Sequence, residues 1–168
     1  KRKILQALSA FIFLYFVGSG YSFAQTFNLE TGSAVSGTPA GWTNAGIGTY
    51  YRANSATAIT SNNTTLGAAC NGRTTANVTG SSTFYFVPSV AITAISFTGT
   101  GTGSNRTFSS IATSSTINGT YTVISGASGT GGIGTGGAAN CGTISVTNIG
   151  TINSGLFIRV VLSGNINI

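Results

Sequence analysis

The sequence predicts an all-β fold, an antiparallel β-sandwich of the jelly-roll type, and two observations lead to this class. After residue 25, no stretch carries apolar residues at the i, i+3, i+4, i+7 spacing that a helix requires. Short runs rich in β-branched and aromatic residues recur instead, separated by Gly, Ser, Asn and Thr. Such runs, repeated along one chain, are typical of sandwiches and jelly rolls.

The first 24 residues differ from the rest and have the layout of a secretory signal peptide. Basic residues 1–3 precede an apolar stretch over 4–17, and Ser22 and Ala24 are the small side chains that a signal peptidase requires. The apolar stretch is short for a membrane span, which needs about 20 residues. We therefore expect a signal-peptide helix, cleavage before Gln25, export, and no stable membrane insertion afterwards. The alternative is a retained membrane anchor or a pilin-type helix.

The exported part, residues 25–168, has the length of one ordinary domain, so we expect a single core. Its last residue, Ile168, lies within an alternating apolar run. We therefore expect the sheet to be completed by residues beyond it, and further domains of the same protein to follow.

The N-terminal half of this domain contains short β-type runs with turn residues between them. The expected strands are residues 26–30, 49–53, 56–60, 83–87 and 90–98. Pro88 separates the last two. Because proline cannot donate a hydrogen bond to a ladder, we expect it at a sheet edge or a turn.

The C-terminal half has clearer turn signals. The expected strands are residues 107–113, 120–125, 142–148, 156–162 and 165–168. Asn118 and Gly119 suit a type I′ turn between the first two strands, because both tolerate a positive φ. Residues 125–138 are Gly-rich and of low complexity, so we expect a long flexible loop there.

One strand shows which of its faces is buried. In residues 156–162 the side chains alternate between two faces. The face expected in the core carries Leu156, Ile158, Val160 and Leu162, and the opposite face carries Phe157, Arg159 and Val161.

The chain has two cysteines, Cys70 and Cys141, so one intramolecular pairing exists. An exported chain enters an oxidising space, and we therefore expect a disulfide between them. Closing a loop of this length would stabilise the fold by about 4 kcal/mol in the chain-entropy model. The alternative is a pair of free, buried thiols.

The net charge of +6 overstates the basic character of the exported domain. Three of the seven basic residues lie in the leader, and the other four are arginines scattered singly along the chain. Binding to nucleic acid requires clustered Lys and Arg. No nucleic-acid partner is therefore expected.

Most catalytic devices require residue types that this chain lacks. It contains no His and a single carboxylate, Glu30. Glycoside hydrolysis normally uses two carboxylates, and a Ser or Cys nucleophile needs a base. Zinc and calcium sites draw on the same side chains. We therefore expect no catalytic residue, no metal and no cofactor.

Aromatic and uncharged polar side chains remain for recognition, and they suit neutral sugars. Aromatic side chains cover apolar ring faces, while Asn and Arg bond hydroxyl groups. The candidate ligand-binding residues are Trp42, Tyr51, Arg52, Tyr85, Phe157 and Arg159. The alternative is that the rings fill the core: Trp42 follows a Gly- and Pro-bearing loop, and either Tyr50 or Tyr51 must face inward.

Several short segments resemble the jelly-roll modules of large bacterial proteins exported by the type IX secretion route. The matching segments are Phe27–Glu30, Pro39–Thr43, Ile95–Phe97, Asn118–Thr122, Phe157–Arg159 and Leu162–Ile168. Such modules accompany adhesins and polysaccharide-degrading enzymes. The resemblance implies an accessory or adhesive module near the N-terminus of a longer protein. In such modules an Asp-rich strand often holds calcium, whereas this chain has no Asp.

Together, these observations predict a secreted, non-catalytic binding or adhesion module that recognises neutral carbohydrate or a cell surface. The alternative is a structural subunit of an extracellular filament or surface layer. In that case an exposed final strand would pair with a neighbouring copy.

Overall fold

A computed structural model describes part of the chain. The described residues are 33–36, 41–51, 61–65, 74–76, 81–100, 105–134 and 141–166. Within them the chain forms twelve strands and no helix. The expected leader over 1–24, the expected strands at 26–30 and 56–60, and the candidate Arg52 lie outside the described residues.

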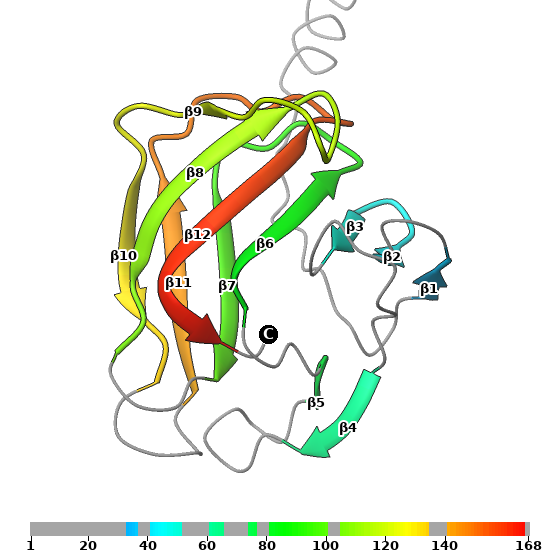
Figure 1. Cartoon of the computed structure of the whole chain (residues 1–168), viewed down its shortest axis with the longest axis vertical. Helices are drawn as coiled ribbons and strands as arrows, with labels where there is room; N and C mark the ends of the chain where they lie inside the picture. The colour runs from blue at the N-terminus through cyan, green and yellow to red at the C-terminus, as the bar shows by residue number, and fades with distance from the viewer. Residues whose placement is uncertain are drawn as a thin grey trace, which may run out of the picture.

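The larger sheet is antiparallel and has seven strands in the order β1-β2-β3-β6-β12-β8-β9. These strands are β1 Ser33–Val35, β2 Gly41–Asn44, β3 Gly48–Tyr51, β6 Ser81–Pro88, β12 Phe157–Ile166, β8 Phe108–Ser114 and β9 Thr122–Val123. Figure 1 shows β12 between β6 and β8, and the register confirms that it pairs with both. The strands expected at 49–53, 83–87, 107–113 and 156–162 therefore lie in one sheet.

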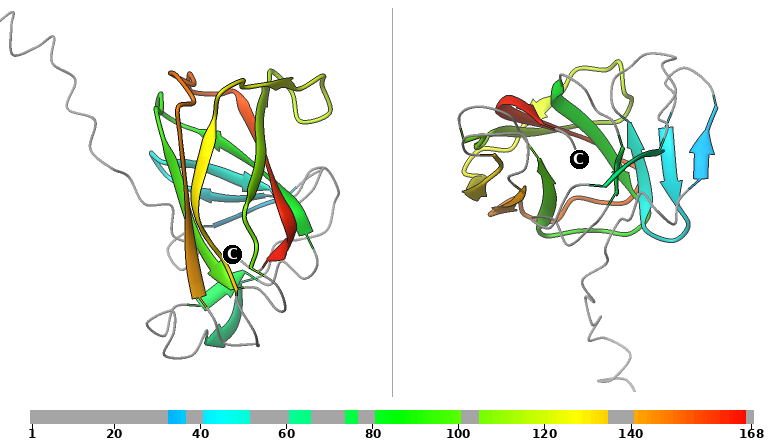
Figure 2. Two further views of the ribbon diagram at one scale, coloured as in Figure 1. Left: turned by 90° about the vertical axis from the view of Figure 1, so that its left-hand side faces the viewer. Right: turned by 90° about the horizontal axis from the view of Figure 1, so that it is seen from below.

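The second sheet is also antiparallel, with the order β10-β11-β7. Its strands are β10 Ser128–Gly132, β11 Cys141–Thr147 and β7 Ile95–Thr100. It lies behind β6, β12 and β8 in Figure 1, and the side view in Figure 2 shows the two layers facing each other. A further antiparallel pair joins β4 Ser61–Thr65 to β5 Thr74–Ala76. The all-β prediction is confirmed, and the facing sheets have the arrangement of a β-sandwich.

The Gly-rich segment expected to be a flexible loop contains a strand instead. β10 pairs with β11 over its whole length. Its glycines leave room where the backbone passes close to other atoms: a Cβ at Gly129 would collide with Phe108, and one at Gly131 with the carbonyl of Thr143. Low complexity was therefore misleading, because this strand needs backbone pairing and clearance more than it needs side chains.

The hairpin expected at Asn118-Gly119 exists, but the prediction of a type I′ turn was wrong. β8 pairs with β9 through Ala112 and Val123, and neither Asn118 nor Gly119 has a positive φ. A longer loop joins the strands because Ile117 folds back and is buried. Within that loop the Gly119 amide donates to the Thr116 carbonyl at 3.1 Å.

Two strand boundaries also differ from expectation near Pro88 and Gly164. Pro88 ends β6, as its missing donor indicated, but β7 begins only at Ile95, and Ile92 forms an isolated bridge with Ile152. At the other boundary, the strands expected at 156–162 and 165–168 are one strand with a register irregularity after Val161.

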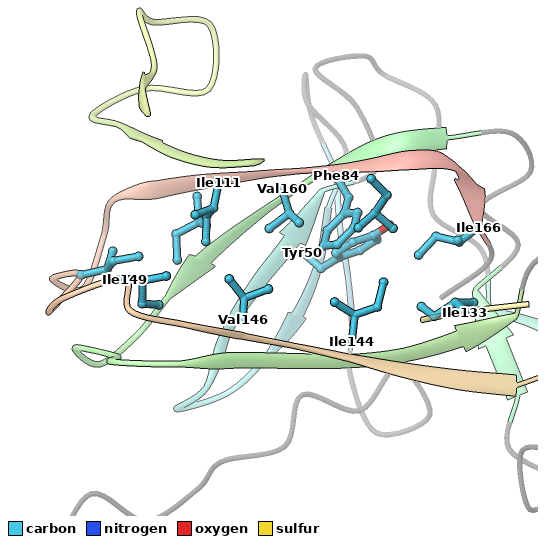
Figure 3. Close-up of a cluster of buried hydrophobic side chains, with 12 residues drawn as sticks. Tyr50, Phe84, Ile111, Ile133, Ile144, Val146, Ile149, Val160 and Ile166 are labelled. Atoms are coloured by element: carbon cyan, nitrogen blue, oxygen red, sulfur yellow. The ribbon is translucent and has the colours of Figure 1, made fainter. Parts of the chain in front are cut away.

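The core lies between the two sheets, as Figure 3 shows. Residues from the larger sheet include Ile111, Val160 and Phe84, and they face Val146 and Ile144 from the smaller sheet. Each fully buried Ile or Val stabilises the fold by roughly 1.5–3 kcal/mol.

The alternation expected in the last strand is confirmed. Ile158 and Val160 are 0% exposed and Leu162 is 3% exposed, while Phe157 and Arg159 on the other face stay half-buried.

Cys141 begins β11 and is not a free cysteine. Cys70, however, lies outside the described residues. The pairing of Cys70 with Cys141 stays a prediction.

A candidate ligand-binding face

Three of the candidate residues form a row across three neighbouring strands of the larger sheet. Tyr51 on β3 lies opposite Tyr85 on β6, and Tyr85 lies opposite Arg159 on β12. Opposite residues of paired strands share a face, and successive residues alternate. Because Tyr50 and Phe84 are buried in the core, the row of Tyr51, Tyr85 and Arg159 faces outward.

Phe157 adds a second ring to this outer face. It lies two residues before Arg159 on the same strand, so both side chains project from the same side. Its ring centroid is 5.9 Å from that of Tyr51, with 36° between the ring planes. This separation is typical of a favourable aromatic pair.

Tyr121 also belongs to this face, although it was not among the residues predicted from the sequence. It lies in the β8–β9 loop, and its ring centroid is 5.8 Å from that of Tyr85. The Cζ atom of Arg159 lies 4.6 Å from the centre of the Tyr121 ring, a cation–π geometry. The Tyr121 hydroxyl donates to the Ile117 carbonyl at 3.1 Å and so anchors the loop.

We call these five residues the aromatic face: Tyr51, Tyr85, Tyr121, Phe157 and Arg159. All five are half-buried, because they cover one another in part while keeping contact with solvent. Four of the six sequence candidates are thus brought together from three strands.

The other two candidates do not join this row in the described structure. In the register of β2 with β3, Trp42 lies opposite Tyr50, and Gly41 lies opposite Tyr51. A Cβ at Gly41 would lie 2.7 Å from a Tyr51 ring carbon, so the glycine leaves space for this ring. Arg52 follows Tyr51 but is outside the described residues.

The Arg159 guanidinium has an unusual environment. Its Nε is enclosed and has no hydrogen-bond partner, and no other described residue forms an ion pair or hydrogen bond with the group. The terminal nitrogens are not among the enclosed atoms. An enclosed donor without an acceptor costs about 1–3 kcal/mol. The Tyr121 ring is therefore the one partner of this cation within the described part of the chain.

The Tyr121 hydroxyl is the group of the aromatic face whose pKa departs from its ordinary value. Burial raises the pKa of the Tyr121 hydroxyl above 10.0, Tyr85 adds to the increase, and Arg159 opposes it. The phenol therefore stays neutral, and the described residues include no acid or histidine that could titrate below it. The face offers rings, hydroxyls and one cation, but no group suited to proton transfer near neutral pH.

The outer face of the smaller sheet is chemically different. Its outward residues are hydroxyl side chains in cross-strand register, and we call them the hydroxyl face: Ser96, Thr98, Ser128, Thr130, Thr143, Ser145 and Thr147. The hydroxyls of Thr98 and Thr143 are 2.8 Å apart, and those of Ser96 and Ser145 are 3.1 Å apart. This face carries no ring and no charge.

In the described ranges, no group of three or more Cys, His, Asp or Glu side chains could hold a metal ion. No helix in that part of the chain has the length and apolar character needed to cross a membrane. No family model, curated protein or solved structure matches this chain. The fold and the aromatic face therefore define the class: an all-β, two-sheet domain with one ring-bearing outer surface.

Proposed function

We propose that this chain is a secreted, non-catalytic binding module that recognises carbohydrate on a polymer or a cell surface. In this proposal residues 1–24 direct export, the sandwich is of the jelly-roll type, and further domains of the same protein follow. The row of Tyr51, Tyr85 and Arg159, flanked by two more rings, carries the proposal.

The geometry of the row supports recognition of an extended ligand. Tyr51 and Arg159 are separated by two inter-strand spacings, about 9–10 Å in a sheet. Sugar rings present apolar faces that pack on aromatic side chains, and their hydroxyls accept hydrogen bonds from a guanidinium. The three strands hold these groups on a rigid surface, so little conformational entropy is lost when a ligand binds.

The same face supports binding without turnover. Its titratable groups are tyrosines and one arginine, and hydrolysis of a glycosidic bond normally needs two carboxylates. A glycan array read beside a hydrolysis assay tests both halves of the proposal. Retention on at least one polysaccharide with no release of reducing ends is expected from the purified chain. Turnover of any glycan, or no retention on any, would contradict the proposal.

A structural subunit of a filament or surface layer is the second candidate. The strand first expected to join two copies, residues 165–168, lies partly outside the described residues, and its described part pairs with β6 at Ile166. The strand β10 is at a sheet edge instead and contains only Ser, Gly and Thr. Uncharged edge strands are templates for pairing with another chain. A filament subunit would grow in size with concentration, whereas a binding module would stay monomeric.

A further inference from the structure

We infer that the ligand of the aromatic face carries a carboxylate, as an acidic sugar does, and that Arg159 binds it. This inference rests on the proposed function and makes its ligand more specific. The sequence favoured a neutral sugar because charged residues are scarce. The structure changes that expectation, because the guanidinium within the ring cluster has no ion pair or hydrogen bond from any described residue.

The contact with Tyr121 leaves the donors of Arg159 available. The Cζ atom of Arg159 lies over the Tyr121 ring, 4.6 Å from the ring centre. This contact uses the positive charge and takes no N–H group to an acceptor atom, so the terminal donors stay available for hydrogen bonds. Since Nε is enclosed and the terminal nitrogens are not, an incoming anion meets the end of the fork. A carboxylate accepts two parallel hydrogen bonds in that geometry.

Charge favours the same choice. The described residues include two arginines, Arg106 and Arg159, and no acidic residue that would repel an anion. A sugar hydroxyl would accept one charge-assisted hydrogen bond from the guanidinium but would supply no opposite charge. A carboxylate supplies that charge and accepts two parallel hydrogen bonds from the fork. An acidic sugar therefore satisfies both the rings and the cation.

The experiment compares two ligands that differ only in charge. Calorimetry would measure the affinity of the purified chain for an oligomannuronate and for its methyl ester, which has the same backbone without the carboxylates. We expect the acid to bind about tenfold more tightly or better, the range of one charge-assisted pair. Arg159→Gln should remove this preference. Arg159→Lys should keep only part of it, because it retains the charge without the planar fork.

Arg106→Gln is the matched control, since it removes the same charge outside the aromatic face. Arg106 lies near Gly164 and donates from Nε to the Asn165 carbonyl at 3.4 Å. This variant should keep the preference for the acid. A thermal unfolding curve for each variant would show that the fold is intact, and Arg159→Lys provides the comparison if Arg159→Gln does not fold.

The outcomes separate this inference from the function on which it rests. Equal affinity for the acid and its ester would overturn the acidic ligand and leave carbohydrate binding standing. Binding of dextran sulfate as tightly as the uronate would also overturn it, because the contact would then be unspecific attraction to a polyanion. Failure to bind the uronate, its ester and every glycan of the array would overturn the proposed function itself.

Discussion

The two outer faces of this sandwich are built by the same alternation of side chains, yet they differ in what they leave unsatisfied. On the hydroxyl face, side chains bond one another across strands, as Thr98 and Thr143 do at 2.8 Å. On the aromatic face, Arg159 has an enclosed Nε without an acceptor and no counter-ion among the described residues. Hydroxyls that hydrogen-bond to one another are satisfied without a ligand. A cation among rings that has no counter-ion in the described residues is stabilised when a ligand supplies one.

In the proposed function, this difference assigns binding to the aromatic face. A polar outer face keeps the sheet soluble in a chain with only 5% charged residues. The aromatic face has the composition that binding surfaces generally share, since aromatic side chains and Arg are enriched in them, and the proposal therefore gives it the recognition role.

Ile144→Ala should destabilise both faces together, because its side chain is 0% exposed between the two sheets. Loss of a buried Ile side chain costs about 2–5 kcal/mol, since the cavity closes only in part. Urea unfolding followed by circular dichroism measures the change. Separate unfolding transitions for the two sheets would show that the aromatic face and the hydroxyl face do not share one core.

Gly131→Ala should destabilise the strand that forms one side of the hydroxyl face, by about 1–3 kcal/mol. Gly131 has a φ of +87°, and its new Cβ would also meet the Thr143 carbonyl. Gly126→Ala is the control: φ is +84° there, but no atom lies within 4 Å of the Cβ. Because both variants place Ala at a similar positive φ, the difference between their midpoints of thermal unfolding measures the cost of the contact between the new Cβ and the Thr143 carbonyl. Equal midpoints would show that β10 is not held against β11 as described.

The parts of the fold that follow from local pattern could be predicted from the sequence. Ile158 and Val160 flank Arg159, so the one charged residue of this apolar run indicates which face of the strand turns away from the core. The missing donor of Pro88 indicates a strand end for the same local reason. The strand β10 could not be predicted in this way, because its glycines carry no pattern and its pairing depends on β11.

The sequence predicted most of the residues of the candidate site, but it did not predict that they lie together on one face. Tyr51, Tyr85 and Arg159 are widely separated in sequence, and their row exists because β3, β6 and β12 pair in one register. No feature of a single segment encodes that register. Tyr121 was missed for a related reason: its loop is held by the burial of Ile117 and by the hydrogen bond from the Tyr121 hydroxyl to the Ile117 carbonyl, and neither contact can be read from a local pattern.

Tyr85→Ala should weaken glycan retention about tenfold, while Thr98→Ala should leave it unchanged. Tyr85 lies at the centre of the row, between Tyr51 and Arg159, and its ring also contacts Tyr121. Removing a central aromatic anchor from a binding surface costs at least about 1–2 kcal/mol. Affinity electrophoresis in the retained polysaccharide measures both variants. A larger effect from Thr98→Ala would assign binding to the hydroxyl face and reverse the comparison.

Tyr121→Phe should give the smallest loss of stability, and the size of this loss should depend on pH. The variant loses the hydrogen bond to the Ile117 carbonyl, worth about 0.5–1.5 kcal/mol, but keeps the ring on Arg159. Burial raises the pKa of this phenol in the folded chain above 10.0, so the unfolded chain loses the proton first. The stability that the hydroxyl contributes is therefore complete below pH ~10 and is lost as pH rises through the raised pKa.

The difference in thermal midpoint between the wild-type chain and Tyr121→Phe should thus be constant from pH 6 to about pH 9 and should shrink above pH ~10. A difference that grows at high pH would mean that the phenolate is favoured in the folded chain. In that case Arg159 would outweigh burial, and the cation would already have its counter-ion within the aromatic face.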